Sequence, residues 1–499
     1  MIRRNALKAG LEALLALLPL PGAAAAKAGG FAPQAGGAVL NVKDFGAVGD
    51  DRADDHPAIA RALDAARKAG EYGGGAQGSI VFFPPGIYRL SRPLDCTQRQ
   101  FNLVGSGAYQ TVLRGATRGS GEAVIDFTGA GFSTVRDLLV DVVTDANGNP
   151  APRASTVGIL IARAAGGASV SGVNLQNVVV RLKSDPGANG GNGTVALYNF
   201  GAEEANYHNV YLRGDCGLMV TSENAAGSGG YGLRSLYRPI LQGSASNTAI
   251  NVTGLSSLIG IAGPALRLNG GAAMQVDAFL STHAALPQGE FPSVRRYPYA
   301  IHSRSSWIDF RHSGSMESFE GLLHVDGAPM LGLRLYTYMG RSATHPAILL
   351  SGNATLQGGD LDVTPNAAVV ERVSYLIDDD STRGPARYLR GCHVKLRNQR
   401  IRLRAPGSAV VANVIQSETP LEATLASLSA PTPLAGNVIT AVDGVQVNGV
   451  NLSPSRGWGA ATGTASRAPF DTRTATTRDV AERLKALIDD LAAKGLLGG

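Results

Sequence analysis

The sequence predicts an all-β solenoid, a fold in which short strands are wound into stacked coils. Glycine supplies 64 of the 499 residues, about 13% against an ordinary share of about 7%, and this abundance favours many tight turns. Short alternating apolar segments recur at irregular spacings of mostly about 20 to 40 residues, as coils with insertions do. One long solenoid therefore accounts for the length better than several separate domains.

Composition and charge exclude other classes. A hydrophobic fraction of 44% without a Gly-X-Y period excludes a disordered chain and collagen. The net charge is only +6, and even the basic stretch 387–404 is dispersed, so we expect no nucleic-acid partner. Arginine can instead bind the carboxylate or sulfate groups of an acidic polymer, although biased codon usage explains the arginines equally well. The three cysteines, Cys96, Cys216 and Cys392, form no disulfide framework or paired metal spacing, and we expect them to be buried.

The first 28 residues are predicted to be an export signal. Arg3 and Arg4 resemble the twin-arginine signal, and the apolar stretch Leu11–Leu20 that follows is too short to span a bilayer. Small residues then fit a cleavage site. An ordinary amphipathic helix is the alternative, since Glu12 interrupts the stretch. We expect a periplasmic or extracellular protein with no membrane partner once the signal is removed.

The mature chain is predicted to begin with a strand and a capped helix. Leu40–Asp50 alternates and then turns at glycine. Asp54–Pro57 supplies capping carboxylates and an early proline for a helix over Ala58–Lys68, which ends at Gly70. Three elements follow: a buried strand over Ser79–Phe83, a turn at Pro84–Gly86 and a strand over Ile87–Leu90.

These elements carry a family resemblance. The spaced pattern is Val42-x-Asp44-Phe45-Gly46-Ala47-x-Gly49-Asp50, then Asp54-Asp55, Ala58-Ile59 and Phe83-Pro84-x-Gly86-x-Tyr88. It resembles the entry segment of pectate-lyase-superfamily proteins, which include rhamnogalacturonase-like enzymes, polygalacturonase relatives and phage tailspikes. The chain departs from the family pattern at Asp51 and His56, which changes a turn and a cap locally. The resemblance implies a right-handed, single-stranded parallel β-helix over residues 38–430 with an N-terminal capping helix.

The rest of the chain is compatible with such coils. Nine apolar segments recur after residue 120: Val124–Phe127, Gly158–Ile161, Val195–Tyr198, Leu218–Val220, Ala249–Val252, Ala265–Leu268, Ala300–His302, Leu322–Val325 and Ala347–Leu350. Three second strands align with one another, Asp137–Asp141, Asn177–Arg181 and Asn209–Arg213. The period of two points Leu138, Val140, Val178, Val180, Val210 and Leu212 inward, and Asp141, Arg181, Tyr211 and Arg213 outward.

The C-terminal part differs in composition. Residues 431–475 are predicted to be a Gly/Asn/Thr-rich linker or a small β segment, and 476–499 an amphipathic helix with its cap at Thr476–Asp479. The helix carries one apolar stripe, formed by Val480, Leu484, Leu487 and Leu491. It resembles short C-terminal helices of phage-tail-like proteins, so the stripe forms either a homotrimeric coil or a contact with its own domain.

Two polar clusters are candidates for chemistry. In the first, Glu203, Tyr211, Arg213 and Asp215 are candidate catalytic residues, and Arg181, Tyr207 and His208 candidate substrate-binding residues. In the second, Arg311, His312 and Glu317 are candidate catalytic residues, and Tyr299 and His302 candidate binding residues. Both clusters are also compatible with an ordinary polar outer face of a solenoid. The triple acid Asp378–Asp380 is read as a solvated loop.

Two reactions remain open for these clusters. For β-elimination, Arg213 or Arg311 would neutralise a uronate carboxylate, with Tyr211 or His312 as base and acid. For glycosidic hydrolysis, Glu203, Asp215 and Glu317 would supply the acid and its partner. The polygalacturonase signatures Asn-Thr-Asp, Gly-His-Gly and Arg-Ile-Lys are absent. Metal dependence is undetermined, since family lyases can hold calcium with acids from several coils.

The leading hypothesis is an exported polysaccharide lyase or glycoside hydrolase that acts on an acidic or complex polysaccharide. The resemblance and the export signal motivate it. The alternatives are a non-catalytic carbohydrate-binding, tailspike-like or adhesin-like surface protein, and a purely structural solenoid, because a fold alone does not fix a function.

Overall fold

The computed structural model describes most of the chain after residue 38. The described residues are 39–69, 79–115, 122–142, 156–162, 170–182, 194–203, 205–221, 248–269, 272–282, 297–304, 308–317, 319–327, 329–339, 345–365, 375–379, 384–397, 399–421, 424–425, 428–429, 436–442, 444–447, 450–451 and 476–493. The predicted export signal, residues 1–28, lies outside them.

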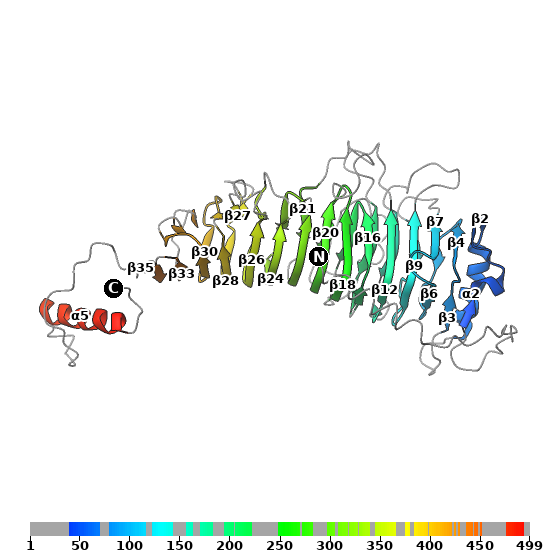
Figure 1. Ribbon diagram of the computed structural model, residues 1–499, viewed down its shortest axis with the longest axis horizontal. Coiled ribbons are helices and arrows are strands. Elements are labelled where there is room, and N and C mark those ends of the chain that lie inside the picture. Colours follow the sequence, from blue (N-terminus) through cyan, green and yellow to red (C-terminus); the bar gives the residue numbers. More distant parts are fainter. Residues whose placement is uncertain are drawn as a thin grey trace, which may run out of the picture. The chain divides into compact units, whose positions relative to one another are not determined.

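Parallel strands from successive coils pair into two large sheets (Figure 1). Sheet I contains twelve strands: β5 (Leu94–Asp95), β8 (Ala123–Asp126), β10 (Val157–Ala162), β13 (Val195–Phe200), β17 (Cys216–Thr221), β19 (Leu266–Asn269), β21 (Tyr299–Arg304), β23 (Gly321–Asp326), β25 (Ile348–Ser351), β27 (Tyr375–Asp379), β29 (Arg400–Arg402) and β32 (Leu428–Ser429). Eight of the nine predicted segments belong to these strands. Ala249–Val252 lies in sheet II instead.

Sheet II contains twenty-one described strands: β1 (Val39–Asn41), β2 (Asp50–Asp54), β3 (Ile80–Phe82), β4 (Gly86–Leu90), β6 (Asn102–Val104), β7 (Thr111–Gly115), β9 (Thr134–Val142), β12 (Asn174–Leu182), β15 (Ala205–His208), β16 (Tyr211–Gly214), β18 (Thr248–Gly260), β20 (Ala272–Thr282), β22 (Ile308–Glu317), β24 (Pro329–Met339), β26 (Thr355–Pro365), β28 (Tyr388–Leu396), β30 (Ala409–Val411), β31 (Val414–Ser417), β33 (Val438–Ala441), β34 (Gly444–Val447) and β35 (Val450–Asn451). A third sheet pairs β11 (Val170–Ser171) with β14 (Ala202–Glu203). Parallel pairing runs from β1–β3 to β31–β33, after which β33, β34 and β35 pair antiparallel. The described chain is therefore a parallel β-helix, as the sequence predicts.

Sheet II bends at a corner that divides it into a first arm, before the corner, and a second arm, after it. In β9, Thr134–Arg136 pairs with β6 and Leu139–Asp141 pairs with β7. Asp137 stands between these two stretches with a φ of 58°. Asn177 and Asn209 occupy the same corner in later coils, with φ of 53° and 51°. Asp and Asn tolerate this left-handed backbone better than other non-glycine residues.

Side-chain amides connect these corners from coil to coil. Asn177 Nδ2 donates to Asp137 Oδ1 at 2.9 Å, and Asn209 Nδ2 donates to Asn177 Oδ1 at 2.7 Å. The predicted alignment of the three second strands is confirmed, because Val178 pairs with Leu138 and Val180 with Leu212. The ladder fixes the register in which their inward and outward positions repeat.

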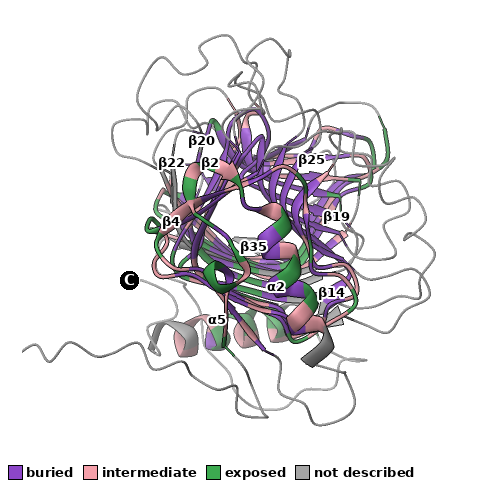
Figure 2. Cartoon of the chain, turned by 90° about the vertical axis from the view of Figure 1, so that its right-hand side faces the viewer, coloured by how far each residue is buried: buried purple, intermediate pink, exposed green. Residues whose placement is uncertain are grey.

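The interior is one contiguous apolar core that extends from the N-terminal helix to β33. Figure 2 shows the buried residues on the strands and helix α2 (His56–Ala69) among the elements at the near end. Ile59 and Leu63 of α2 are buried in the same core, so the helix covers the end of the coil interior. All three cysteines are buried, as predicted, and burial raises the pKa of the Cys216 thiol to about 12.

The entry motif is a single packed unit. Asp55 is buried, and its carboxylate accepts hydrogen bonds from the N–H groups of Val48 and Gly49 at 2.6 and 3.1 Å. Gly49 has a φ of 70°, and a Cβ there would lie 2.9 Å from the Tyr88 ring. A Cβ on Gly86 would lie 2.8 Å from the carbonyl oxygen of Gly49. Close packing of the turn against Tyr88 therefore explains why glycine stands at both positions.

The interpretation of Asp378 and Asp379 as part of a solvated loop is wrong. Both residues belong to β27 and are buried. Arg402 forms a bidentate ion pair with Asp378, through Nε at 2.9 Å and through Nη2. Asp379 pairs with buried Arg387 at 3.3 Å and with Arg404 at 3.0 Å. These arginines of the basic stretch serve internal pairing rather than a polymer ligand.

Helix α5 (Thr477–Ala493) confirms the predicted C-terminal helix. Thr476 Oγ1 donates to Asp479 Oδ2 at 2.6 Å and accepts from the Asp479 N–H at 3.2 Å, which caps the first turn. Its apolar stripe is exposed at Val480, Leu484 and Leu487. Among the helices of the described chain, none has the length and apolar content needed to cross a membrane.

Candidate functional site

Part of the first predicted cluster lies on the second arm of sheet II. Arg213 of β16 is in register with Arg181 of β12. Arg181 pairs at 3.3 Å with Asp141, a buried carboxylate that also pairs at 3.4 Å with Arg114. Tyr211 lies two residues before Arg213 on the same outer face, beside an apolar row of Val112, Leu139 and Val179. As predicted, Asp141, Arg181, Tyr211 and Arg213 point away from the core.

Five predicted site residues are instead buried, which corrects their assignment as residues that contact a polymer: Tyr207, Asp215, Tyr299, His302 and His312. Tyr207 has no exposed surface, and its hydroxyl accepts from Asn199 Nδ2 at 2.8 Å. Asp215 is also fully buried and accepts from the Thr194 N–H at 3.2 Å. His312 pairs in register with Val276 and Leu335 inside the core, and burial lowers its pKa to about 4. Tyr207 pairs in register with Leu175 and Val252, so it too occupies an inward strand position.

Other members of the two clusters lie on different sheets. Exposed His208 and Arg311 lie on the first arm of sheet II, where His208 Nδ1 contacts Thr253 Oγ1 at 3.2 Å. Glu203 belongs to the third sheet, paired with Ser171, and Glu317 ends β22 on the second arm. The side chains of Glu203 and Glu317 lie outside the described residues. The predicted catalytic residues are therefore not gathered into one site.

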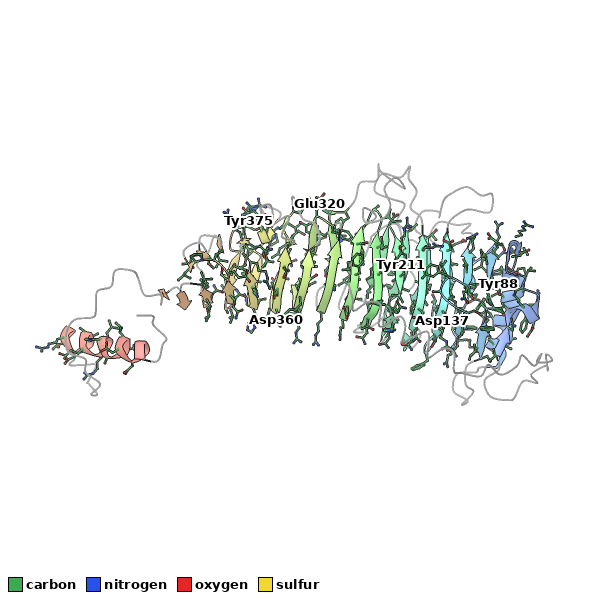
Figure 3. The ribbon with its side chains drawn as sticks, viewed as in Figure 1. Tyr88, Asp137, Tyr211, Glu320, Asp360 and Tyr375 are labelled. Atoms are coloured by element: carbon green, nitrogen blue, oxygen red, sulfur yellow. The ribbon has the colours of Figure 1, made fainter. Side chains whose placement is uncertain are left out.

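Tyr299 and His302 lie on β21 of sheet I, where the structure does gather acid–base groups. His302 is in register with His324 of β23, and the two rings stack with centroids 4.9 Å apart and an interplanar angle of 14°. We define the histidine cluster by six residues of the outer face of sheet I and the turn before it: Tyr297, His302, Arg304, His324, Asp326 and Ser351. Glu320, labelled in Figure 3, lies just before β23, and its N–H donates to the carbonyl oxygen of Pro298, the residue after Tyr297.

A continuous hydrogen-bond chain joins the histidine cluster. Asp326 Oδ2 accepts from Arg304 Nε at 2.6 Å and contacts His302 Nε2 at 3.2 Å. Asp326 Oδ1 accepts from Ser351 Oγ at 3.1 Å. Ser351 Oγ in turn contacts His324 Nε2 at 2.7 Å, and His324 Nδ1 contacts the Tyr297 hydroxyl. The chain runs from a phenol at one end to a carboxylate at the other.

The proton positions in this chain follow from its chemistry. An ionised carboxylate only accepts, so Ser351 donates its one proton to Asp326. His324 Nε2 must then donate to Ser351 Oγ. A neutral imidazole that donates through Nε2 accepts through Nδ1, which makes the Tyr297 hydroxyl the donor to His324. Every member thus points its proton toward Asp326.

Electrostatics hold Asp326 ionised and His302 neutral. The hydrogen bond from His302 and the Arg304 guanidinium lower the pKa of Asp326 well below its usual range. Burial lowers the pKa of His302 to about 4, although Asp326 acts in the opposite direction. The exposed fraction of the side chain is 48% for Arg304 and 24% for Asp326, so the cluster is open to solvent at this end.

Further titratable groups flank the histidine cluster. Arg267 of β19 is in register with His302. Tyr299 lies under the cluster with its ring centroid 5.6 Å from that of His324, and burial raises its pKa. Glu320 pairs with His345 at 2.7 Å. The outer face of sheet I therefore combines cationic, acidic and aromatic groups over neighbouring coils.

The sequence interpretation missed His324, Asp326 and Ser351. A signal was present, because Ala300–His302 and Leu322–Val325 were both recognised as recurring strands. Superposing these two strands places His302 and His324 at equivalent positions. Ser351 follows the next strand of the same series, Ala347–Leu350. Within the described ranges, no group of three or more His, Cys, Asp and Glu side chains could hold a metal ion.

The fold and this face define a parallel β-helix protein with an acid–base cluster on one sheet. Residues 39–230 match the family model for rhamnogalacturonase A/epimerase, pectate lyase-like domains. This part of the chain is therefore similar to pectate-lyase-superfamily proteins, as the entry motif predicted. The histidine cluster lies after the matched residues, so the match does not assign it.

Curated relatives match a limited part of the chain. Identity is 39% over 113 residues to mannuronan C5-epimerase AlgE6 of Azotobacter vinelandii, covering 20% of this chain and 12% of the relative. Alginate lyase 7 of the same organism is 40% identical over 80 residues, covering 15% and 8%. A probable glucan endo-1,3-beta-glucosidase of Arthroderma benhamiae is 36% identical over 107 residues, covering 19% and 12%.

The solved structures that resemble this chain are more distant in sequence. The A-module of AlgE6 from Azotobacter vinelandii has a TM-score of 0.41 and 17% identity, covering 76% of this chain and all of that one. Bacteriophage CBA120 tailspike protein 2 has a TM-score of 0.44 and 12% identity, covering 72% and 47%.

Proposed function

We propose that the protein is an exported enzyme that cleaves a uronate-containing polysaccharide by β-elimination, with the histidine cluster as its site. The observation that carries the proposal is the unbroken chain Tyr297–His324–Ser351–Asp326, with Arg304 at the carboxylate end. Mannuronan and alginate, which appear in the names of the matched relatives, are the first substrates to test.

The arrangement suits proton abstraction next to a carboxylate. Tyr297 passes its proton to His324 Nδ1, and the resulting phenolate accepts the proton from the carbon beside the uronate carboxylate. The electron pair of that C–H bond forms a carbon–carbon double bond, and the bond to the glycosidic oxygen on the next carbon breaks. The leaving oxygen takes a proton from solvent or from the site.

Arg304 suits the substrate's negative charge. It is half exposed and binds Asp326 through Nε, and a guanidinium presents further N–H donors on its Nη nitrogens in a geometry that fits a carboxylate. Neutralising the uronate makes the adjacent C–H more acidic. The neutral His302 and ionised Asp326 hold Arg304 and the proton chain in place.

The same geometry argues against hydrolysis at this site. Hydrolysis by paired carboxylates requires one of them to be protonated as the general acid. Asp326 has a lowered pKa and remains ionised. Elimination needs no protonated carboxylate, because Tyr297 and His324 exchange the proton.

The test is to incubate the purified mature chain with mannuronan, alginate and a neutral β-1,3-glucan. Elimination predicts new reducing ends together with the absorbance of unsaturated products on the uronate polymers only. Reducing ends without that absorbance would indicate hydrolysis and contradict the proposal. Deuterium incorporation at C5 without cleavage would indicate epimerisation, and binding without any turnover would indicate an adhesin-like protein.

A further inference from the structure

A second feature lies on the second arm of sheet II, away from the histidine cluster. Strands β24, β26, β28 and β31 place Tyr336, Asp362, Lys395 and Gln416 in one row of register partners. Asp360 and His393 form a parallel row two residues earlier on the same strands. These six residues, the sugar groove, line a cavity of about 230 Å³.

The chemistry of the sugar groove differs from that of the histidine cluster. Tyr336 is 52% exposed, so the face of an aromatic ring is available beside hydrogen-bonding groups. Asp360 and Asp362 accept hydrogen bonds, Lys395 donates them, and Gln416 does both. A sugar hydroxyl both donates and accepts, and the C–H face of a pyranose ring is apolar. The groove offers hydrogen-bonding groups for the hydroxyls and an aromatic ring for the apolar C–H face.

The charges of the groove are compensated by neighbouring side chains. Asp360 pairs with His393 at 3.2 Å and lies 4.0 Å from Arg334. Asp362 accepts from Arg397 Nε at 3.0 Å and Nη2 at 3.2 Å. Lys395 lies 3.7 Å from Glu418, which also pairs with Arg397 at 3.0 Å. A groove without excess positive charge favours an uncharged ligand over a uronate.

We propose that the sugar groove binds an uncharged sugar ring, independently of the histidine cluster. Its volume lies below the roughly 300 to 1,000 Å³ of pockets that enclose drug-sized ligands, so it accommodates one ring rather than an oligomer. In Figure 3, Asp360 of the groove and Glu320 beside the histidine cluster lie at opposite edges of the coils. A polymer held at the groove therefore leaves the histidine cluster accessible.

The test measures binding of a β-1,3-linked glucose trisaccharide to the full mature chain by calorimetry and by saturation-transfer NMR. Tyr336→Ala is expected to weaken binding on the order of tenfold, because it removes the stacking surface. Tyr109→Ala is the matched control, since Tyr109 is another exposed tyrosine, at 68%. Gln416→Ala is a second groove variant, which keeps the test decisive if Tyr336→Ala does not fold.

Three results would overturn the proposal. The first is that the glucose trisaccharide does not bind. The second is that it binds equally well to both groove variants. The third is that a mannuronate trisaccharide binds and loses affinity to the same extent in Tyr336→Ala. Tyr297→Phe should leave the affinity for the glucose trisaccharide unchanged. Because the probe is neutral and binding is measured at equilibrium, failure here is distinct from failure of the proposed uronate cleavage.

Discussion

Replacing Asp379 by alanine should be among the most destabilising single changes in the C-terminal coils. The Asp379 carboxylate accepts from the backbone N–H groups of Arg404 and Ala405 at 2.6 and 2.9 Å. It also pairs with Arg387, whose side chain is only 2% exposed. Without Asp379 the Arg387 guanidinium remains buried and uncompensated, which costs about 3 to 5 kcal/mol. That is a large part of a typical unfolding free energy of about 5 to 15 kcal/mol.

Three comparisons make this prediction specific. Arg387→Met should cost less than Asp379→Ala, because the carboxylate keeps Arg404 and two backbone donors. The double variant Asp379→Leu with Arg387→Met should recover part of the loss, since no charge is left buried. Asp64→Ala breaks an exposed pair with Arg67 and should change stability by less than about 1 kcal/mol. Urea unfolding at neutral pH measures all four, and an Asp379→Ala effect as small as that of Asp64→Ala would refute the reasoning.

Three further predictions concern the corner ladder, the buried histidine and the tail. Asn177→Ala should lower the free energy of unfolding, measured in urea, by about 2 kcal/mol, and Asn177→Gly by about half of that. Both variants lose the side-chain hydrogen bonds, but only alanine is also strained at a φ of 53°. Equal losses for the two variants would contradict this explanation of the corner. His312 has a pKa of about 4 folded against about 6.5 unfolded, so the unfolded chain binds more protons between these values and stability falls as pH falls through this window. His312→Leu should reduce that slope by up to about 1.4 kcal/mol per pH unit, and an unchanged slope would exclude His312 as its source. If α5 associates through its exposed stripe, light scattering should give a threefold larger mass for residues 29–499 than for residues 29–469, whereas two equal monomer masses would exclude the trimer.

Much of the fold could be predicted because its determinants are local. Short apolar or alternating segments mark many of the strands, and glycine or asparagine occupies many of the left-handed turn positions. The entry motif carries the resemblance to the superfamily because Gly49, Asp55, Gly86 and Tyr88 pack against one another, so their spacing is set by direct contacts. The corner residues Asp137 and Asn177 are also local determinants, because Asp and Asn tolerate the left-handed backbone of the corner.

The site could not be predicted as well, because coils differ in length. Corner residues are 40 positions apart between Asp137 and Asn177 but 32 between Asn177 and Asn209. His324 and Ser351 are 27 positions apart and in contact. Arg311 is much closer to His302 in sequence, yet it lies on sheet II. Proximity along the chain therefore grouped residues that the coils separate.

The ion pairs between charged residues could not be predicted from the sequence either. The acidic run at Asp378 is typical of an exposed loop, and the basic stretch that follows is typical of a polymer-binding surface. Strand pairing brings the two together, since Asp378 is in register with Arg402. Because the two charges neutralise each other, the pair can lie at a largely buried position. Neither the pairing nor the burial can be predicted until the coil register is known.

The most direct test of the proposed site is turnover of mannuronan by Tyr297→Phe, with Tyr109→Phe as the control. The account predicts that Tyr297→Phe lowers kcat for unsaturated-product formation by about 10² to 10⁴-fold, with KM and the folded-state spectrum unchanged. This follows because the substitution removes only the phenolic hydroxyl, whose oxygen accepts the substrate proton, and leaves the aromatic ring in place. Wild-type turnover in Tyr297→Phe would remove the histidine cluster as the site of chemistry.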